Sequence, residues 1–296
     1  MICANAWANE CGGRFFLSGK AVWAMEKAKQ ERLFSLLRAY GSLAVALSGG
    51  VDSAVLLKAA VKTLGREKVA AVMAVSELLS GDELADAKRC AKLCGVTLTT
   101  LPAEDLSSPD VVRNDAKRCY YCKKRRFEMI VEWAREHGCR HVAEGTNVDD
   151  AADYRPGLAA IEELAPAVVS PLKEAGWGKA DIRRAAKAWG MPVWDKPSAA
   201  CLASRVAYGI ELTGERLRAV ETAEAAIRRC VRGQIRVRHH GDLARIEIEP
   251  ASFDAFWQHR EELETAVRAA GFAYVTLDLG GYRMGSQNES MSHAFS

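Results

Sequence analysis

A short segment with two glycines carries the first chemical signal in the sequence. SGGVDS occupies positions 48–53, directly after a short apolar run and before a segment with helical periodicity. Two glycines allow a tight turn and a close approach of the backbone to a ligand, and the helix that follows offers unpaired N–H groups and a positive dipole end to phosphate. Hydroxyls can donate hydrogen bonds, and an aspartate can hold a Mg²⁺ ion that bridges phosphates. We therefore predict a phosphate site at Ser48, Gly49, Gly50, Asp52 and Ser53.

A second polar segment, EGTNVDD at 144–150, also follows an apolar run. Glu144, Asn147, Asp149 and Asp150 could bind a metal ion or a ribose. The simpler alternative is a polar loop that contains an Asx turn.

Two cysteines stand at the start of a predicted helix, as Cys119 and Cys122 in RCYYCK. A helix N-terminus and neighbouring cations stabilise thiolates. We therefore predict that the helix dipole, with Arg118, Lys123 and Lys124, lowers the pKa of these thiols.

A third cysteine, Cys201, lies in KPSAACLASR, a loop of small residues that also contains Arg205. Four kinds of chemistry stay open for the three thiols. A structural zinc ion would need a fourth ligand, and a redox dithiol would use Cys119 and Cys122 alone. A nucleophile would use Cys201 alone, whereas an iron–sulfur cluster would use all three and leave one iron open to another ligand.

The other cysteines favour packing over chemistry. The chain has nine cysteines, and an odd count without an export signal argues against a disulfide framework. Cys90 and Cys94 are four residues apart on a predicted helix and are expected to pack on one apolar face. Cys139 and Cys230 each close a helix.

The bulk composition argues against several classes of protein. The chain has 296 residues, of which 49% are hydrophobic and 27% charged, with a net charge of +3. So small a positive surplus gives little support to a dedicated nucleic-acid binder. No apolar run approaches the ~20 residues that span a bilayer, and the start lacks the pattern of a signal peptide. We expect a cytoplasmic protein without a membrane partner.

The elements that position these residues alternate between strands and helices up to about residue 210. The predicted strands are short continuous apolar runs, at 42–47, 69–75, 97–102, 141–146 and 167–172. The pattern predicts an α/β fold with a parallel sheet covered on both faces, in which ligands bind at the carboxyl ends of the strands.

The rhythm then changes to a helix, two strands separated by Gly241-Asp242, a second helix and a last strand. We expect a small α+β module with an antiparallel sheet. The predicted organisation is an unassigned N-terminal extension at 1–24, the α/β domain at 25–210 and the small domain at 211–296.

Two arginines of the small domain, Arg236 and Arg238, are two positions apart on a predicted strand and should project from one face. Guanidinium groups suit phosphate, although an ordinary solvated strand face would give the same pattern.

SGGVDS matches the PP-loop of ATP pyrophosphatases, which cleave ATP between the α and β phosphates. Over nearly all of 25–290, the chain resembles the LarE family. Five segments carry this resemblance in order: SGGVDS, NDAKRCYYCKKRRF, EGTNVDD followed by DYRPG, KPSAACLASR, and DLGGYRMGSQNE.

The resemblance implies an ATP-dependent sulfurtransferase that acts on a pyridinium-3,5-biscarboxylate mononucleotide for nickel-pincer cofactor synthesis. ATP with Mg²⁺ would adenylate a carboxylate, and a sulfur nucleophile would then displace AMP. In one branch of the family the cysteine that matches Cys201 gives up its own sulfur. In another, three cysteines hold a [4Fe-4S] cluster that carries sulfide, and the presence of Cys119 and Cys122 favours this branch.

The resemblance also implies roles for individual residues. Gly145, Thr146 and Asn147 would lie near the nucleotide, and Asp52, Cys201 and Arg205 would form the catalytic set. Arg283 would join Arg236 and Arg238 at the substrate phosphate. The implied divalent-cation group consists of Glu224, Glu247 and Asp254. The expected partners are a nucleotide substrate, a sulfide or sulfur donor, and further copies of the chain.

Two rival enzymes share the PP-loop. A tRNA thiolase would add an RNA-binding module or a zinc ribbon, and the sequence has no second cysteine quartet and a nearly balanced charge. An amidating synthetase would use ammonia and would not need the three cysteines. A module that senses ATP without turnover is the non-enzymatic alternative.

Overall fold

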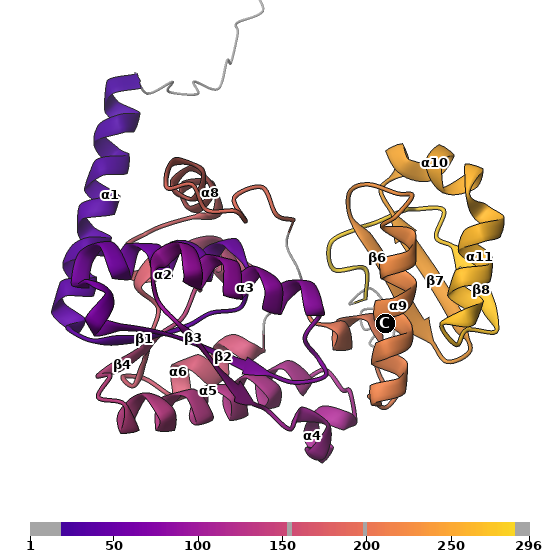
Figure 1. Cartoon of the computed structure of the whole chain (residues 1–296), viewed down its shortest axis with the longest axis horizontal. Helices are drawn as coiled ribbons and strands as arrows, with labels where there is room; N and C mark the ends of the chain where they lie inside the picture. The colour runs from indigo at the N-terminus through magenta and orange to yellow at the C-terminus, as the bar shows by residue number, and fades with distance from the viewer. Residues whose placement is uncertain (1–18, 153–155, 198–199, 288–296) are drawn as a thin grey trace, which may run out of the picture.

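The computed structural model describes residues 19–152, 156–197 and 200–287. The described chain forms two parts, each built on its own sheet (Figure 1). Three groups of motif residues lie outside the described residues: Asp153 to Arg155 of DYRPG, Ser198 and Ala199 of KPSAACLASR, and the last two residues of DLGGYRMGSQNE. So does most of the predicted extension 1–24, although the first helix already begins at Gly19.

The larger part contains a five-stranded sheet in the order β3-β2-β1-β4-β5, with every neighbouring pair parallel. Its strands are β1 (Leu43–Ala46), β2 (Val69–Val75), β3 (Leu98–Pro102), β4 (His141–Ala143) and β5 (Val168–Val169). The predicted α/β fold with a parallel sheet is confirmed. One detail is wrong, because β3 is not buried throughout: it lies at the edge, where its side chains are exposed or half-buried.

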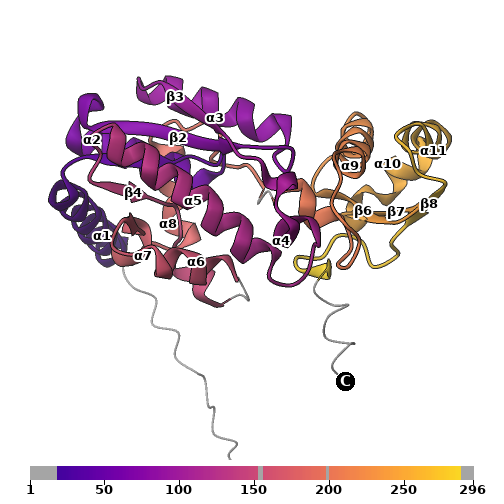
Figure 2. The same ribbon diagram turned by 90° about the horizontal axis from the view of Figure 1, so that it is seen from below.

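Helices cover both faces of this sheet (Figures 1 and 2). Successive strand residues point to opposite faces, so Leu43 and Val45 join one apolar core and Ala44 and Val72 join another. The first core packs against α1 (Gly19–Tyr40), α2 (Val51–Leu64), α3 (Gly81–Cys94) and α8 (Lys179–Ala188). The second packs against α5 (Arg118–Glu136) and α6 (Gly157–Glu163).

Short helices complete the connections. They are α4 (Pro109–Val112) and α7 (Pro171–Glu174), with 3₁₀ turns η1 (Arg66–Lys68), η2 (Asp105–Ser107), η3 (Val148–Ala152) and η4 (Leu202–Arg205). Cys90 and Cys94 are buried in the first core, as their spacing predicted.

The smaller part contains β6 (Ile235–His240), β7 (Leu243–Ile248) and β8 (Tyr274–Leu277). Its helices are α9 (Gly214–Ile227), α10 (Phe253–Gln258) and α11 (Arg260–Ala269), with the 3₁₀ turn η5 (Pro250–Ser252). The β6–β7 hairpin is antiparallel as expected, but β7 and β8 are parallel. The predicted all-antiparallel sheet is wrong because α10 and α11 form a long crossover that returns β8 in the direction of β7.

The two parts share an apolar core at their junction. Leu78 and Val111 from the larger part, and Leu202 and Val206 from the connecting segment, pack in one cluster with the small-domain side chains. The predicted domain boundary near residue 210 stays a prediction. No helix among the described residues has both the length and the apolar content needed to cross a bilayer.

A buried ion pair fastens the same junction. The Arg205 guanidinium donates through Nε to the Glu224 carboxylate at 2.9 Å, and Arg228 donates to it at 2.8 Å. Burial alone would raise the pKa of Glu224, but these arginines outweigh it and hold the pKa below its ordinary value.

Replacing Glu224 with alanine should lower the free energy of unfolding by about 3–5 kcal/mol at neutral pH, because the buried Arg205 loses its counter-ion. The pair stabilises the fold above the unfolded glutamate pKa of about 4.3, and this contribution is lost as pH falls through the lower folded pKa. Urea unfolding at pH 7 and at pH 3 measures both effects.

The matched control is Glu264→Ala, which removes an exposed ion pair with Arg268. It should change stability by no more than about 0.5 kcal/mol. Equal effects of the two substitutions would show that the buried pair does not hold the junction.

Candidate functional site

The turn between β1 and α2 is built around Gly49. This residue has φ of 73°, and a Cβ atom on it would lie 2.2 Å from the carbonyl oxygen of Glu83, so glycine alone fits. The Ser53 hydroxyl oxygen accepts the Ser48 N–H at 3.1 Å and lies 3.2 Å from the Gly50 carbonyl. The predicted phosphate turn is therefore fixed by its own contacts and opens onto the N-terminus of α2.

Asp52 lies in the first turn of α2. Its Oδ2 accepts a hydrogen bond from Lys179 Nζ at 2.5 Å, while its buried Oδ1 has no hydrogen-bond partner among the described residues. Burial raises the pKa of Asp52, although Lys179 opposes the shift, and the nearby Asp150 adds to it. A half-buried carboxylate with one unpartnered oxygen, beside a phosphate turn, has the chemistry of a Mg²⁺ ligand.

The segment after β4 packs directly on this turn. A Cβ atom on Gly145 would lie 3.0 Å from the Ser53 nitrogen, so the two loops touch through glycine. Glu144 is buried and accepts hydrogen bonds from the Thr146 hydroxyl at 2.7 Å and from Lys123 at 3.4 Å. The contact brings the two predicted nucleotide segments together.

Asn147 has a supporting position within that segment. Its side chain is fully buried, donating to Asp150 at 2.8 Å and accepting from the Asp149 N–H at 3.0 Å. Asp149 in turn accepts the Lys179 N–H at 2.6 Å. The predicted Asx turn is present, and direct nucleotide binding by Asn147 stays a prediction.

The three cysteines of interest converge at the junction of the two parts. Cys119 and Cys122 lie among the first five residues of α5, and Cys201 immediately precedes η4. The buried Arg118 joins the two segments, because it contacts the Cys119 sulfur at 3.6 Å and donates to the Ala203 carbonyl at 3.0 Å. Burial opposes its charge, yet the nearby thiolates of Cys201 and Cys119 raise the pKa of Arg118.

The predicted lowering of both thiol pKa values is wrong for Cys122. Burial raises the pKa of this thiol to about 12, although Arg126 opposes the shift. Asp105, which lies 3.7 Å from the sulfur, and the thiolates of Cys201 and Cys119 raise it further. The helix dipole is too weak to offset desolvation and three negative neighbours. Such a thiol stays protonated unless a bound cation draws off the proton.

The spread of the three sulfurs bears on which metal they could hold. Among the described residues, only one group of histidine, cysteine and carboxylate donors has all its ligand atoms within 4.8 Å of one another, and it contains none of these three cysteines. Four ligands crowd closely around a single zinc ion, whereas a four-iron cluster separates its cysteines. As placed, the three sulfurs are therefore not gathered as closely as the ligands of one zinc ion.

A cleft of about 260 Å³ lies between the two parts, beside the cysteine junction. Lys196 connects it to the phosphate turn, donating to the Gly49 carbonyl at 3.3 Å and pairing with Asp86. Arg205 also lines the cleft, and its guanidinium donates hydrogen bonds to the Ala200 and Cys201 carbonyls. The cleft is lined by charges of both signs, the cations Lys196, Arg205, Arg228 and Arg236 and the carboxylates Asp82, Glu221 and Glu224.

The three arginines predicted to bind the substrate phosphate differ in their location and contacts. Arg236 and Arg238 are buried on one face of β6, as their spacing predicted. Burial lowers the pKa of Arg236 to about 10, helped by Arg205 and Arg238, and its guanidinium lies 5.3 Å from the Tyr282 ring centre. Of the three predicted phosphate ligands, Arg236 lines the cleft, while Arg283 contacts Asp278 at 3.4 Å.

The structure does not bring together the three predicted acidic ligands. Glu224 is held by Arg205 and Arg228, and Glu247 accepts from Arg238 at 2.8 Å and from Arg245 at 2.9 Å. Asp254 is exposed in the first turn of α10. Carboxylates already satisfied by two guanidinium groups serve as anchors for the arginines.

Sequence reasoning missed the residues that hold the site together. Lys179, at the start of α8, carries no motif, and its pairing with Asp52 across 127 positions cannot be read from a sequence. Lys196 and Arg126 stand inside the quoted motifs, so their location was the available signal. Asp105, which pairs with Arg126 at 2.5 Å behind Cys122, lies outside every quoted motif and had no such signal.

Comparison with known proteins gives a consistent assignment. A family model described as a PP-loop domain matches residues 25–154. An uncharacterized protein of Synechocystis is 38% identical over 268 residues, covering 89% of this chain and 99% of that protein. The pyridinium-3,5-bisthiocarboxylic acid mononucleotide synthase of Lactiplantibacillus plantarum is 35% identical, covering 90% and 96%. An uncharacterized protein of Methanocaldococcus jannaschii is 31% identical, covering 81% and 90%.

The steric demand at Gly49 gives a prediction with an internal control. Gly49→Ala should impair ATP binding and destabilise the fold by more than the ~1–2 kcal/mol of a left-handed alanine, because the new Cβ collides with backbone. Gly138 has the same φ of 73°, but no described atom lies within 4 Å of a methyl group added there. Gly138→Ala should therefore cost only the conformational part and leave ATP affinity unchanged. Nucleotide titration and urea unfolding of both variants test this; equal losses would contradict the collision.

Proposed function

The chain belongs to the LarE family of PP-loop proteins, and from this membership we propose that it is an ATP-dependent sulfurtransferase that makes thiocarboxylates. The proposed substrate is a pyridinium-3,5-biscarboxylate mononucleotide, the oxygen counterpart of the product named for the Lactiplantibacillus plantarum relative. The observation that carries the proposal is the meeting of a phosphate turn, three cysteines and a cleft that contains Lys196, Arg205 and Arg236 at one junction.

The first proposed step activates the substrate carboxylate. A carboxylate oxygen attacks the α-phosphorus of ATP, the bond to the β-phosphate oxygen breaks, and an acyl adenylate and pyrophosphate result. The turn at 48–53 and the N-terminus of α2 hold the phosphates. Mg²⁺ supplies charge neutralisation there, and the unpartnered Oδ1 of Asp52 is the atom that fits it.

The second proposed step transfers sulfur. A sulfide equivalent attacks the acyl carbon, the carbon–oxygen bond to AMP breaks, and a thiocarboxylate, AMP and a proton are released. Cys119, Cys122 and Cys201 fit a [4Fe-4S] cluster, which when bound would present sulfide from its open iron. Arg118 and Arg126 flank the thiols and would stabilise their deprotonated form. Arg205 holds the Cys201 backbone in place.

The cations of the cleft support the choice of substrate class, although the carboxylates Asp82, Glu221 and Glu224 also line it. Lys196, Arg205 and Arg236 line it, and a mononucleotide brings both a phosphate and two carboxylates. We also propose that the substrate phosphate contacts Arg236 directly, together with Arg238 and Arg283 at the edge of the cleft. We also propose a cytoplasmic location, an external sulfur donor and a homo-oligomeric state.

Asp52→Ala should abolish the formation of AMP from Mg·ATP while leaving the circular dichroism spectrum unchanged, because the metal loses its carboxylate ligand. AMP is measured with the biscarboxylate substrate present. Asp110→Ala, which removes an exposed carboxylate paired with Arg113, is the control and should be fully active. Undiminished AMP formation by the Asp52 variant would refute the metal role.

Cys119→Ala should abolish the brown chromophore after anaerobic reconstitution with iron and sulfide, because the cluster would lose one of three ligands. Cys139→Ala, at a half-buried thiol beyond α5, should retain it. Binding of about four irons per chain by the Cys119 variant would sink the three-ligand assignment. Loss of the mass of one H₂S from Cys201 after turnover would instead point to sacrificial sulfur donation.

A further inference from the structure

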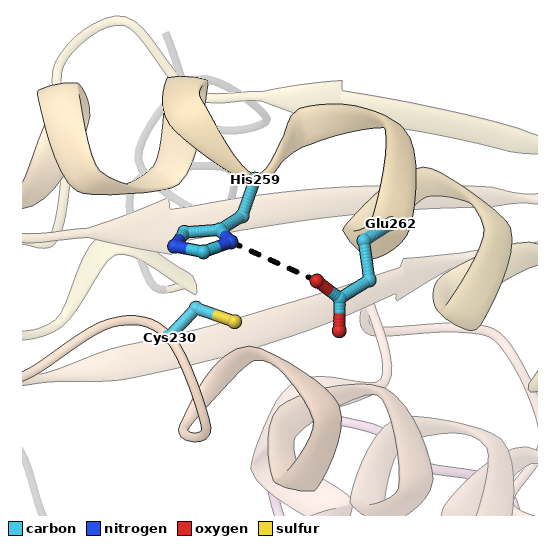
Figure 3. A group of neighbouring side chains, drawn as sticks. All are labelled: Cys230, His259 and Glu262. Atoms are coloured by element: carbon cyan, nitrogen blue, oxygen red, sulfur yellow. Dashed lines mark ion pairs between the residues drawn. The ribbon is translucent and has the colours of Figure 1, made fainter.

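Three metal-binding side chains meet in the small domain, outside the proposed sulfur-transfer residues. Cys230 lies just beyond the end of α9, His259 separates α10 from α11, and Glu262 lies in the first turn of α11 (Figure 3). One ligand atom from each lies within 4.8 Å of the other two. The imidazole Nδ1 and the Glu262 carboxylate are 3.7 Å apart.

Backbone hydrogen bonds and apolar packing fix the segments that carry these three donors. The His259 N–H donates to the Phe256 carbonyl at 3.1 Å, and the His259 carbonyl accepts the Leu263 N–H at 2.9 Å, which fixes the junction of the two helices. Glu262 follows three residues later and so lies on the same face as His259. Buried side chains of α9 and α11 pack in one core, which sets Cys230 opposite them.

The cation and the acids next to His259 are compatible with a bound cation, although Arg229 and Arg232 flank Cys230 in the chain. Arg260, the cation adjacent to His259, forms an ion pair with the Glu261 carboxylate at 2.8 Å, and its guanidinium lies 5.4 Å from the centre of the Trp257 ring. Glu261 and Glu262 stand in the first turn of α11 and offset the positive end of its dipole. His259 and Glu262 are exposed and Cys230 is half-buried, so an ion can enter from solvent.

The donor set selects the kind of ion. A thiolate, an imidazole and a carboxylate suit Zn²⁺, whereas Mg²⁺ and Ca²⁺ prefer oxygen alone. Bonds of about 2.0–2.3 Å place tetrahedral ligand atoms roughly 3.3–3.8 Å apart, so the imidazole and carboxylate are already at the right spacing. Small side-chain rotations would bring in the sulfur.

We propose that Cys230, His259 and Glu262 form a surface site for Zn²⁺, with the fourth position open to water. Binding displaces the Cys230 thiol proton to solvent and leaves zinc coordinated by sulfur, nitrogen and oxygen. The ion ties the end of α9 to the α10–α11 junction. The site is independent of the proposed sulfur transfer, since it shares no residue with it.

Co²⁺ is the spectroscopic probe for this site, added to the full-length chain after reduction and removal of iron. Its sulfur-to-cobalt charge-transfer band should appear in a variant in which Cys119, Cys122 and Cys201 are all serine, with one Co²⁺ bound per chain, and Zn²⁺ should displace it. Adding Cys230→Ser to that variant should remove the band. His259→Gln should weaken Co²⁺ binding by about tenfold to a hundredfold or more.

Matched controls are Cys139→Ser and His137→Gln, a half-buried thiol and an exposed imidazole outside the group, and both should leave the band and the affinity unchanged. Zn²⁺ should also raise the Tm of the chain that retains Cys230 and not of the Cys230→Ser chain. A band that persists without Cys230, or that is absent from the chain lacking Cys119, Cys122 and Cys201, overturns the proposal.

Discussion

The position of Cys201 depends on guanidinium groups that bind the backbone around it. Arg118 donates to the Ala203 carbonyl from α5, and Arg205 reaches back to the Ala200 and Cys201 carbonyls. The segment has no regular sheet or long helix to pair its carbonyls, so these charged donors replace a hydrogen-bond ladder. The Leu202 N–H completes the attachment by donating to the Leu78 carbonyl at 2.9 Å.

Buried guanidinium groups are costly, and the fold compensates for them with carboxylates from the small domain. Arg205 is held by Glu224, and Arg238 is held by Glu247 on the neighbouring strand. Each pair joins separate segments of one apolar cluster, η4 to α9 and β6 to β7, so the ionic contacts fix how these segments align. Specificity of alignment is the role that a buried ion pair fills best, because its net stabilising effect is small.

Patterns along the sequence predicted those features that depend on neighbours in the chain. β2 has its expected bounds because a continuous apolar run between two helices predicts a buried strand. The turn at Gly49 was predicted from the six consecutive residues SGGVDS. The parallel pairing of β8 did not follow, since the direction of a strand depends on how far the preceding helices carry the chain. The pKa of Cys122 was predicted in the wrong direction because burial and the distant Asp105 outweigh the adjacent cations.

Arg236 shows how the same ion-pair arrangement can prepare a binding site. Burial is the main reason that the charge of Arg236 is disfavoured; Arg205 and Arg238 add to the effect, and Glu224 and Tyr282 oppose it. The pKa of Arg236 falls to about 10, which means that the protonated guanidinium is destabilised relative to water. In the proposed function, a substrate phosphate beside Arg236 would offset part of this cost, which is present in the folded chain before the phosphate binds. A neutral residue at this position would remove both the stored cost and the attraction.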